Sequence, residues 1–108
     1  MKEFKLIIAL VNSGFTDVVM DAAREVGARG GTIVRARGTG TKEMEQKYGV
    51  VIGSDKEMVL ILVSNDICDD VLSAINKAAG LSTNGQGIAF SIPVDDVVGL
   101  KFDSTEEK

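Results

Sequence analysis

Four runs of apolar residues alternate with polar and glycine-containing segments along this chain of 108 residues. The first, Phe4 to Val11, is continuous, contains β-branched residues and ends at Asn12-Ser13-Gly14, which is typical of a buried strand. By the same criteria the sequence predicts three further strands, over Thr32–Arg37, Glu57–Val63 and Ile88–Ile92. Pro93 should stop the last of them, because proline cannot donate a backbone hydrogen bond to a neighbouring strand.

Two of the segments between the strands have the spacing of an amphipathic helix, with an apolar stripe opposite charged residues. The first stripe consists of Phe15, Val18, Val19, Ala22, Ala23 and Val26, and Gly27 is placed to end the helix. The second consists of Ile67, Val71, Leu72, Ile75, Ala78 and Ala79. Ser64-Asn65-Asp66 is the predicted cap of this second helix, and Gly80 its predicted end.

The order of these elements is a strand-helix-strand unit that occurs twice. Leu10–Ser13 before the first helix also parallels Leu62–Asn65 before the second, although two amphipathic segments can resemble each other by chance. The doubled unit predicts a ferredoxin-like α+β fold, a four-stranded antiparallel sheet with two helices on one face. We expect residues 1–102 to form one such domain, with a large loop over about 40–56 and a disordered charged tail over 103–108.

The predicted fold leaves one face of the sheet without helices. The first and third strands nevertheless carry large apolar residues at successive positions, Leu6 to Ile8 and Val59 to Leu62. A sheet face in contact with water alternates toward polar residues. We therefore expect other copies of the chain to cover this face in a closed cyclic oligomer.

Composition narrows the range of functions. The net charge of −4 and the pI near 4.7 argue against nucleic-acid binding, which usually requires a basic surface. The chain has no histidine and a single cysteine, Cys68, so His-based catalysis, an internal disulfide and a cysteine metal cluster are excluded. No catalytic group or metal site is predicted, and Cys68 is interpreted as an inert thiol. The cysteine content fits the cytoplasm, and no segment is long enough to insert into a membrane.

The candidate chemistry lies in two glycine-containing segments, Gly38-Thr39-Gly40-Thr41-Lys42 and Asn84-Gly85-Gln86-Gly87. Glycine lets backbone N–H groups turn toward a ligand and lets the ligand come close. We expect the two segments to meet in space and hold a phosphorylated nucleotide, although the chain has neither a Walker A nor a G-x-G-x-x-G motif. Candidate phosphate contacts are Arg35, Arg37, Lys42, Lys47 and Lys101. The alternative is that both segments are simple turns and these cations are solubilising charges.

In the order and spacing of these features the chain resembles the PII signal-transduction family from Phe4 to Lys101. The resemblance rests on Gly30-Gly31-Thr32, Arg37-Gly38-Thr39-Gly40, Val63 to Asp70, Asn84 to Phe90 and Ile92 to Val98. It implies a ferredoxin-like homotrimer that senses an adenine nucleotide in the clefts between subunits, and a mobile T-loop, here shorter than in typical members. The loop would control a target protein, such as a membrane transporter or an enzyme. The protein would thus be a cytoplasmic regulator in nitrogen signalling and not an enzyme.

The resemblance also implies a role for particular residues. Thr32 would contact the adenine, and Lys101 would supply a positive charge to the phosphates. The backbone of Gly38, Thr39 and Gly40 would line one side of the cleft. The backbone of Gly85, Gln86 and Gly87 would cradle the phosphates on the other side. The ligand would be ATP, ADP, AMP or a cyclic form, with no covalent attachment.

Two other functions are compatible with the same fold. One is a ligand-free oligomeric adaptor whose pocket has degenerated. The other is a small enzyme such as an acylphosphatase, whose chemistry requires an arginine and an asparagine at a phosphate-binding loop after the first strand. In this chain that loop, Asn12 to Asp17, contains no arginine.

Overall fold

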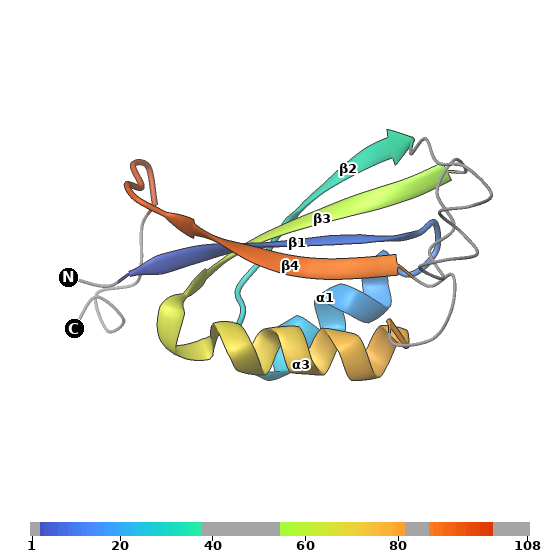
Figure 1. The fold of residues 1–108 in the computed structure, drawn as a ribbon, viewed down its shortest axis with the longest axis horizontal. Coiled ribbons are helices and arrows are strands. Elements are labelled where there is room, and N and C mark those ends of the chain that lie inside the picture. The colour runs from blue at the N-terminus through green and yellow to red at the C-terminus, as the bar shows by residue number, and fades with distance from the viewer. Residues whose placement is uncertain (1–2, 38–54, 82–86, 101–108) are drawn as a thin grey trace.

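The structure is a computed structural model that describes residues 3–37, 55–81 and 87–100 (Figure 1). In chain order the described residues form β1 (Phe4–Asn12), α1 (Thr16–Glu25), β2 (Thr32–Arg37), β3 (Asp55–Ser64), the short 3-10 helix η1 (Asn65–Ile67), α3 (Cys68–Ala79) and β4 (Gly87–Val94). None of the helices in this part of the chain is long and apolar enough to cross a membrane.

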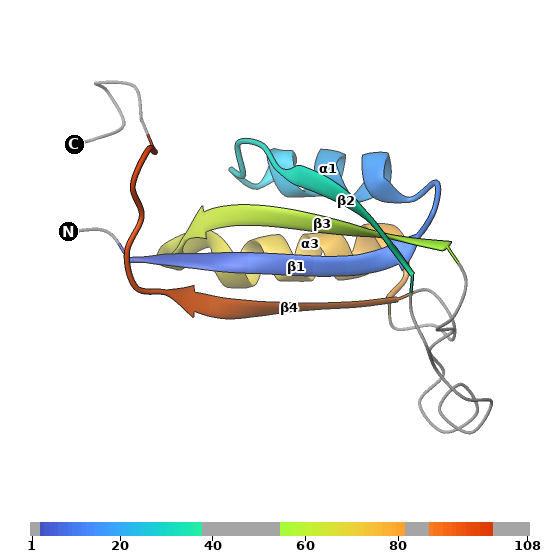
Figure 2. The ribbon, with the colours of Figure 1, turned by 90° about the horizontal axis from the view of Figure 1, so that it is seen from above.

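The four strands form one antiparallel sheet in the order β2-β3-β1-β4. The central pair, β1 and β3, is in register from Phe4 opposite Ser64 to Asn12 opposite Lys56. Both helices lie on the same face of the sheet, and no described element covers the other face (Figures 1 and 2). This arrangement confirms the predicted ferredoxin-like fold.

The hydrophobic core lies between the sheet and the two helices. Its largest contributors from the sheet and helices are fully buried: Ile7, Val11, Val59, Ile61, Val19, Val71 and Ile75. In β1 and β3 buried residues alternate with half-buried ones, because successive side chains of a strand point to opposite faces. Fully burying one such side chain contributes about 1.5–3 kcal/mol, so this layer is a main source of stability. Cys68 is 1% exposed and packs here as a small apolar residue.

Both helices end where the sequence predicts, and each end is fixed by glycine. Gly27 has a φ of 111° and donates its N–H to the carbonyl oxygen of Arg24 at 3.1 Å. The N–H of Ala28 donates to the carbonyl oxygen of Ala23 at 3.0 Å. These two bonds define a Schellman motif, which requires a left-handed residue and therefore favours glycine. Gly80 has a φ of 65° and ends α3 in a similar way.

Two strand boundaries differ from the sequence prediction. β3 begins at Asp55 and not at Glu57, so Asp55 and Lys56 belong to the strand and not to the large loop. β4 extends through Pro93 to Val94, so the expectation that Pro93 stops the strand was wrong. β4 lies at the edge of the sheet, where a missing N–H need not cost a bond to the neighbouring strand.

The predicted helical stripes were wrong at two positions. Val18 is 37% exposed and Ala78 is also exposed, whereas Met20, which was not assigned to the stripe, is buried at 5%. The predicted cap of the second helix, Ser64-Asn65-Asp66, is also wrong, because Asn65 and Asp66 belong to η1 and Ile67 directly precedes α3. Ser64 makes no side-chain capping bond, and η1 separates it from α3.

The sheet face without helices is apolar, as the sequence predicts. Cross-strand register places Leu6, Ile8 and Leu10 of β1 on this face, opposite large apolar residues of β3 and β4. The central side chains are half-buried by their neighbours. On the edge strand β4, Ile88, Phe90 and Ile92 remain 40–42% exposed. This continuous surface of large apolar side chains is called the open face below.

Candidate functional site

The two glycine-containing segments are joined to the sheet at the same end, where β1 and β2 finish and β3 and β4 begin. Arg35 of β2, Glu57 of β3, Val11 of β1 and Gly87 of β4 are in register across the sheet. β2 therefore ends, and β4 begins, at one end of the sheet (Figure 1). This end is called the loop end below, because residues 38–54 and 82–86 are joined to it.

The structure describes two of the eight predicted nucleotide-binding residues. Thr32 is the first residue of β2 and is exposed, and Gly87 is the first residue of β4 and is buried. The other six lie outside the described residues: Gly38, Thr39, Gly40, Gly85, Gln86 and Lys101.

Thr32 and Gly87 are not close to each other within one chain. Thr32 is aligned across the sheet with Leu60, Ile8 and Phe90, so it lies three strand spacings from β4. Gly87 lies three residues before Phe90 on β4. With about 4.8 Å between strands and about 3.3 Å per residue along them, the two residues are roughly 17 Å apart. Within one chain the two residues therefore lie on opposite edge strands of the sheet and at different levels along it.

Gly87 has a structural role that does not depend on any ligand. Its φ is 131°, and a Cβ atom at this position would lie 2.2 Å from the carbonyl oxygen of Leu10. The pairing of β1 with β4 thus leaves no space for a side chain at the start of β4. The sequence signal of paired glycines identified the position but not this reason for it.

The loop end also contains a buried lysine that the sequence prediction had placed in the loop. Lys56 is only 7% exposed, and its Nζ atom donates a hydrogen bond to Oδ1 of Asn12 at 2.5 Å. This bond joins the last residue of β1 to the second residue of β3. The partnership requires the register of β1 and β3, which no local sequence pattern contains. Lys56 is consequently a structural residue of the loop end and not a free charge in a loop.

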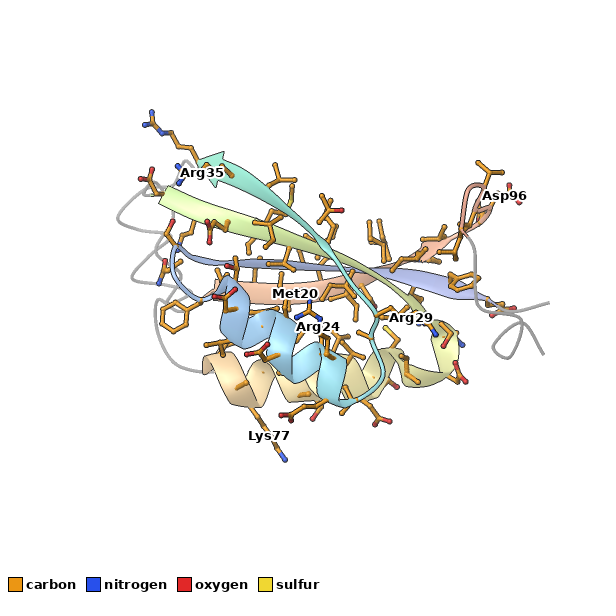
Figure 3. All side chains as sticks on the ribbon, turned by 180° about the vertical axis from the view of Figure 1, so that it is seen from behind. Met20, Arg24, Arg29, Arg35, Lys77 and Asp96 are labelled. Carbon is orange, nitrogen blue, oxygen red and sulfur yellow. The ribbon has the colours of Figure 1, made fainter. Side chains whose placement is uncertain are left out.

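The two arginines of β2 are exposed and lie opposite acidic residues. Arg35 is in register with Glu57, and Arg37 with Asp55. Figure 3 shows the side chain of Arg35 extending outward from the end of β2, away from the helices. Because opposite charges on neighbouring strands partly cancel, the described strands do not form a strongly positive surface at this end.

The described part of the chain forms hollows on its surface, of which two are relevant here. One, with a volume of about 460 Å³, lies at the end of the sheet opposite the loop end and is lined by Phe4, Ala28, Arg29, Leu62, Ile67 and Leu100, among others. The other, of about 510 Å³, is an open groove between α3 and β4, lined by Leu72, Ser73, Asn76, Leu81, Ile88 and Ala89. Neither is lined by a predicted site residue. The groove nevertheless adjoins Gly87 through Ile88.

Fold and loop arrangement together define a small ferredoxin-like protein whose glycine-containing segments attach at one end of its sheet. The family model of the nitrogen regulatory protein P-II matches residues 4–104, nearly the whole chain. The chain therefore belongs to the P-II family of signalling regulators, whose members form oligomers and interact with target proteins.

Two relatives support this assignment. The chain is 29% identical over 102 residues to the nitrogen regulatory protein P-II of Azospirillum brasilense. This alignment covers 90% of this chain and 91% of the relative. Its fold is similar to the crystal structure of Arabidopsis thaliana PII bound to citrate, with a TM-score of 0.69 and 25% identity over 89% of this chain and 81% of that one. The family matches the resemblance found in the sequence.

Proposed function

We propose that this protein is a PII-like regulator that binds an adenine nucleotide in the clefts of a homotrimer and controls a target protein through its T-loop, about residues 40–54. The observation that carries the proposal is the position of Thr32 and Gly87 on opposite edge strands of a P-II family fold. A ring joins its subunits head to tail, so each interface combines two different surfaces of the chain. Such an interface is suited to bring the β2 edge of one chain to the β4 edge of the next.

The open face supports the assembly on independent grounds. Ile88, Phe90 and Ile92 are 40–42% exposed in the single chain, next to the half-buried residues of β1 and β3. A contiguous exposed patch of large apolar side chains often marks a surface that contacts another protein. Each Å² of apolar surface removed from water contributes about 25 cal/mol, which favours burial of the open face around a common axis.

The proposed binding roles divide between side chains and backbone. Thr32 contacts the adenine, and Lys101 supplies positive charge to the phosphates. The peptide groups of the remaining residues line the cleft, namely Gly38, Thr39, Gly40, Gly85, Gln86 and Gly87. The nucleotide is exchangeable and is ATP, ADP, AMP or a cyclic form.

Binding controls function by shifting a conformational equilibrium. A nucleotide that interacts differently with two conformations of the T-loop changes their populations, and only by as much as its affinities for them differ. The T-loop then engages or releases a cytoplasmic enzyme or the cytoplasmic side of a membrane transporter. The protein acts as a regulator in the cytoplasm and catalyses no reaction of its own.

Isothermal titration calorimetry with ATP, ADP, AMP and cyclic AMP tests the proposal, together with a mass measurement by light scattering. We expect a trimer that binds at least one of these nucleotides at micromolar concentration. Thr32→Val removes one hydroxyl and should weaken binding by roughly two- to tenfold, the value of one hydrogen bond. Ser73→Ala, which removes a hydroxyl from the exposed side of α3, is the matched control and should leave binding unchanged. If none of the four nucleotides binds, the ligand-free adaptor replaces the sensor.

A further inference from the structure

The hollow at the end of the sheet opposite the loop end is a consequence of where β2 begins. β2 starts at Thr32, opposite Leu60, so it has no residue to pair with the last part of β3. The chain between α1 and β2 lines the hollow instead, from Gly27 to Gly30. The volume of about 460 Å³ falls within the range of about 300–1,000 Å³ that is usual for small-molecule sites.

Most of the described lining is apolar. Its apolar side chains are Phe4, Ala28, Leu62, Val63, Ile67 and Leu100. Ala28 and Val63 are 7% and 3% exposed, so this part of the wall is held in place by the core. Such a lining favours a ligand with an apolar body, because each Å² of apolar surface removed from water contributes about 25 cal/mol.

Two charged side chains of opposite sign also lie on the described lining. Arg29 comes from the connection between α1 and β2, and Asp66 comes from η1. Figure 3 shows Arg29 at the end of the molecule where β3 leads into η1. Neither residue belongs to the open face, so burial of that face in an oligomer does not remove either charge from the hollow.

The peptide groups of Leu62 add a donor and an acceptor. The carbonyl oxygen of Leu60 faces β2, because it lies 3.0 Å from the position of a Cβ atom added at Gly31. Backbone polar groups two residues apart on a strand face the same side, so the N–H and C=O of Leu62 also point this way. β2 has no residue that pairs with them.

This combination of groups matches a molecule that carries both charges. A ligand with only a carboxylate would meet the carboxylate of Asp66, and a ligand with only an ammonium group would meet the guanidinium group of Arg29. A zwitterion can place each of its charges beside the opposite one. The N–H of Leu62 can donate to its carboxylate, and the C=O of Leu62 can accept from its ammonium group.

We propose that the hollow binds a small zwitterion with an apolar side chain, namely a branched or aromatic α-amino acid, as a second ligand of this protein. Arg29 holds its carboxylate, Asp66 holds its ammonium group, and the apolar lining holds its side chain. The site lies at the opposite end of the sheet from the loop end and does not depend on the nucleotide site proposed above.

Isothermal titration calorimetry of L-leucine and L-phenylalanine on the full-length protein tests the site. Each amino acid is compared with an analogue that lacks the ammonium group, 4-methylpentanoate or 3-phenylpropanoate, and with one that lacks the carboxylate, 3-methylbutylamine or 2-phenylethylamine. We expect at least one amino acid to bind with a Kd of about 1 mM or lower, and both of its analogues to bind at least about tenfold more weakly. Analogues that bind as tightly as the amino acid overturn the proposal, and so does a Kd above about 10 mM for both amino acids.

Two variants assign the charges. Arg29→Gln should remove the advantage of the amino acid over the amine, and Asp66→Asn its advantage over the acid, with a loss of about tenfold in amino-acid affinity in each case. Both residues are exposed, and circular dichroism verifies that the fold is retained. The matched control is Arg24→Gln, which removes the same charge from the exposed side of α1, where Arg24 lies 3.9 Å from Asp21. An equal loss in this control overturns the assignment.

The same titration in saturating ATP tests whether the site is separate. Amino-acid binding that persists supports a second site. Competitive displacement of the amino acid by ATP overturns it, because the hollow would then belong to the nucleotide site. If no nucleotide binds, the function proposed above fails, while the amino-acid titration still decides this inference.

Discussion

Gly87→Ala should destabilise the protein strongly even when no ligand is present. The added Cβ atom would lie 2.2 Å from the carbonyl oxygen of Leu10 and 3.2 Å from the Cα atom of Val11, both backbone atoms of β1 that cannot rotate away. The φ of 131° adds strain, because a residue with a side chain rarely adopts it. Backbone strain of about 1–3 kcal/mol and overpacking of about 1–3 kcal/mol predict a total loss of roughly 2–6 kcal/mol.

Gly30→Ala is the matched control for this change. A Cβ atom added at Gly30 would have no heavy atom within 4 Å, and Gly30 has no positive φ, so the same methyl group meets neither obstacle. A compatible glycine-to-alanine change stabilises a protein by about 0.4–1 kcal/mol, because it restricts the unfolded chain. The two variants should therefore change stability in opposite directions.

Urea denaturation followed by circular dichroism measures both effects. All variants are compared at one protomer concentration, since the stability of an oligomer depends on it. At about 1–3 kcal/mol per molar urea, a loss of about 3 kcal/mol lowers the midpoint by about 1–3 M. Midpoints of Gly87→Ala and Gly30→Ala within about 0.3 M of each other would refute the close packing of β1 against β4 at Gly87.

Three further predictions concern the core and the loop end. Ile61→Ala, at a fully buried position of β3, should cost about 2–5 kcal/mol in urea denaturation, and a cost below about 1 kcal/mol would mean that the sheet–helix layer is not the core. A double-mutant cycle of Asn12→Ala and Lys56→Met should give a coupling energy of about 0.5–3 kcal/mol, whereas additive losses would show that the two side chains do not interact in solution. The thiol of Cys68 is 1% exposed and should react with a thiol reagent only after the protein opens, so the rate of this reaction should rise with urea. Rapid reaction in the native state would contradict the burial of Cys68.

The strands were predictable because their apolar residues are adjacent in the sequence, and the helix ends because Gly27 and Gly80 act locally. The errors arose where distant parts of the chain decide the outcome. Pro93 is compatible with β4 because that strand is at the edge of the sheet, and strand order is not a local property. Lys56 belongs to β3 because Asn12, far away in sequence, lies opposite it.

The candidate site was predictable as a pair of glycine segments but not as a geometry. Apolar and glycine patterns showed which segments end strands, and the sheet register then placed both at the loop end. That Thr32 and Gly87 lie on opposite edges follows only from the strand order. The reason for glycine at position 87 follows only from its contact with Leu10. The glycine pattern shows that glycine stands at position 87, but it does not show whether ligand binding or strand packing requires glycine there.

The pairing of Arg37 with Asp55 has a consequence for how this protein can diverge. It closes the segment 38–54 with a strand pair, so the two ends of the segment are held at a fixed separation by the sheet alone. For chain-closure entropy alone, doubling the number of residues between two strand ends costs only about 0.6 kcal/mol. Insertions and deletions between these two residues are therefore nearly neutral for stability. The part of the chain proposed to contact a target can change its length and sequence freely, while the sheet and its assembly remain constant.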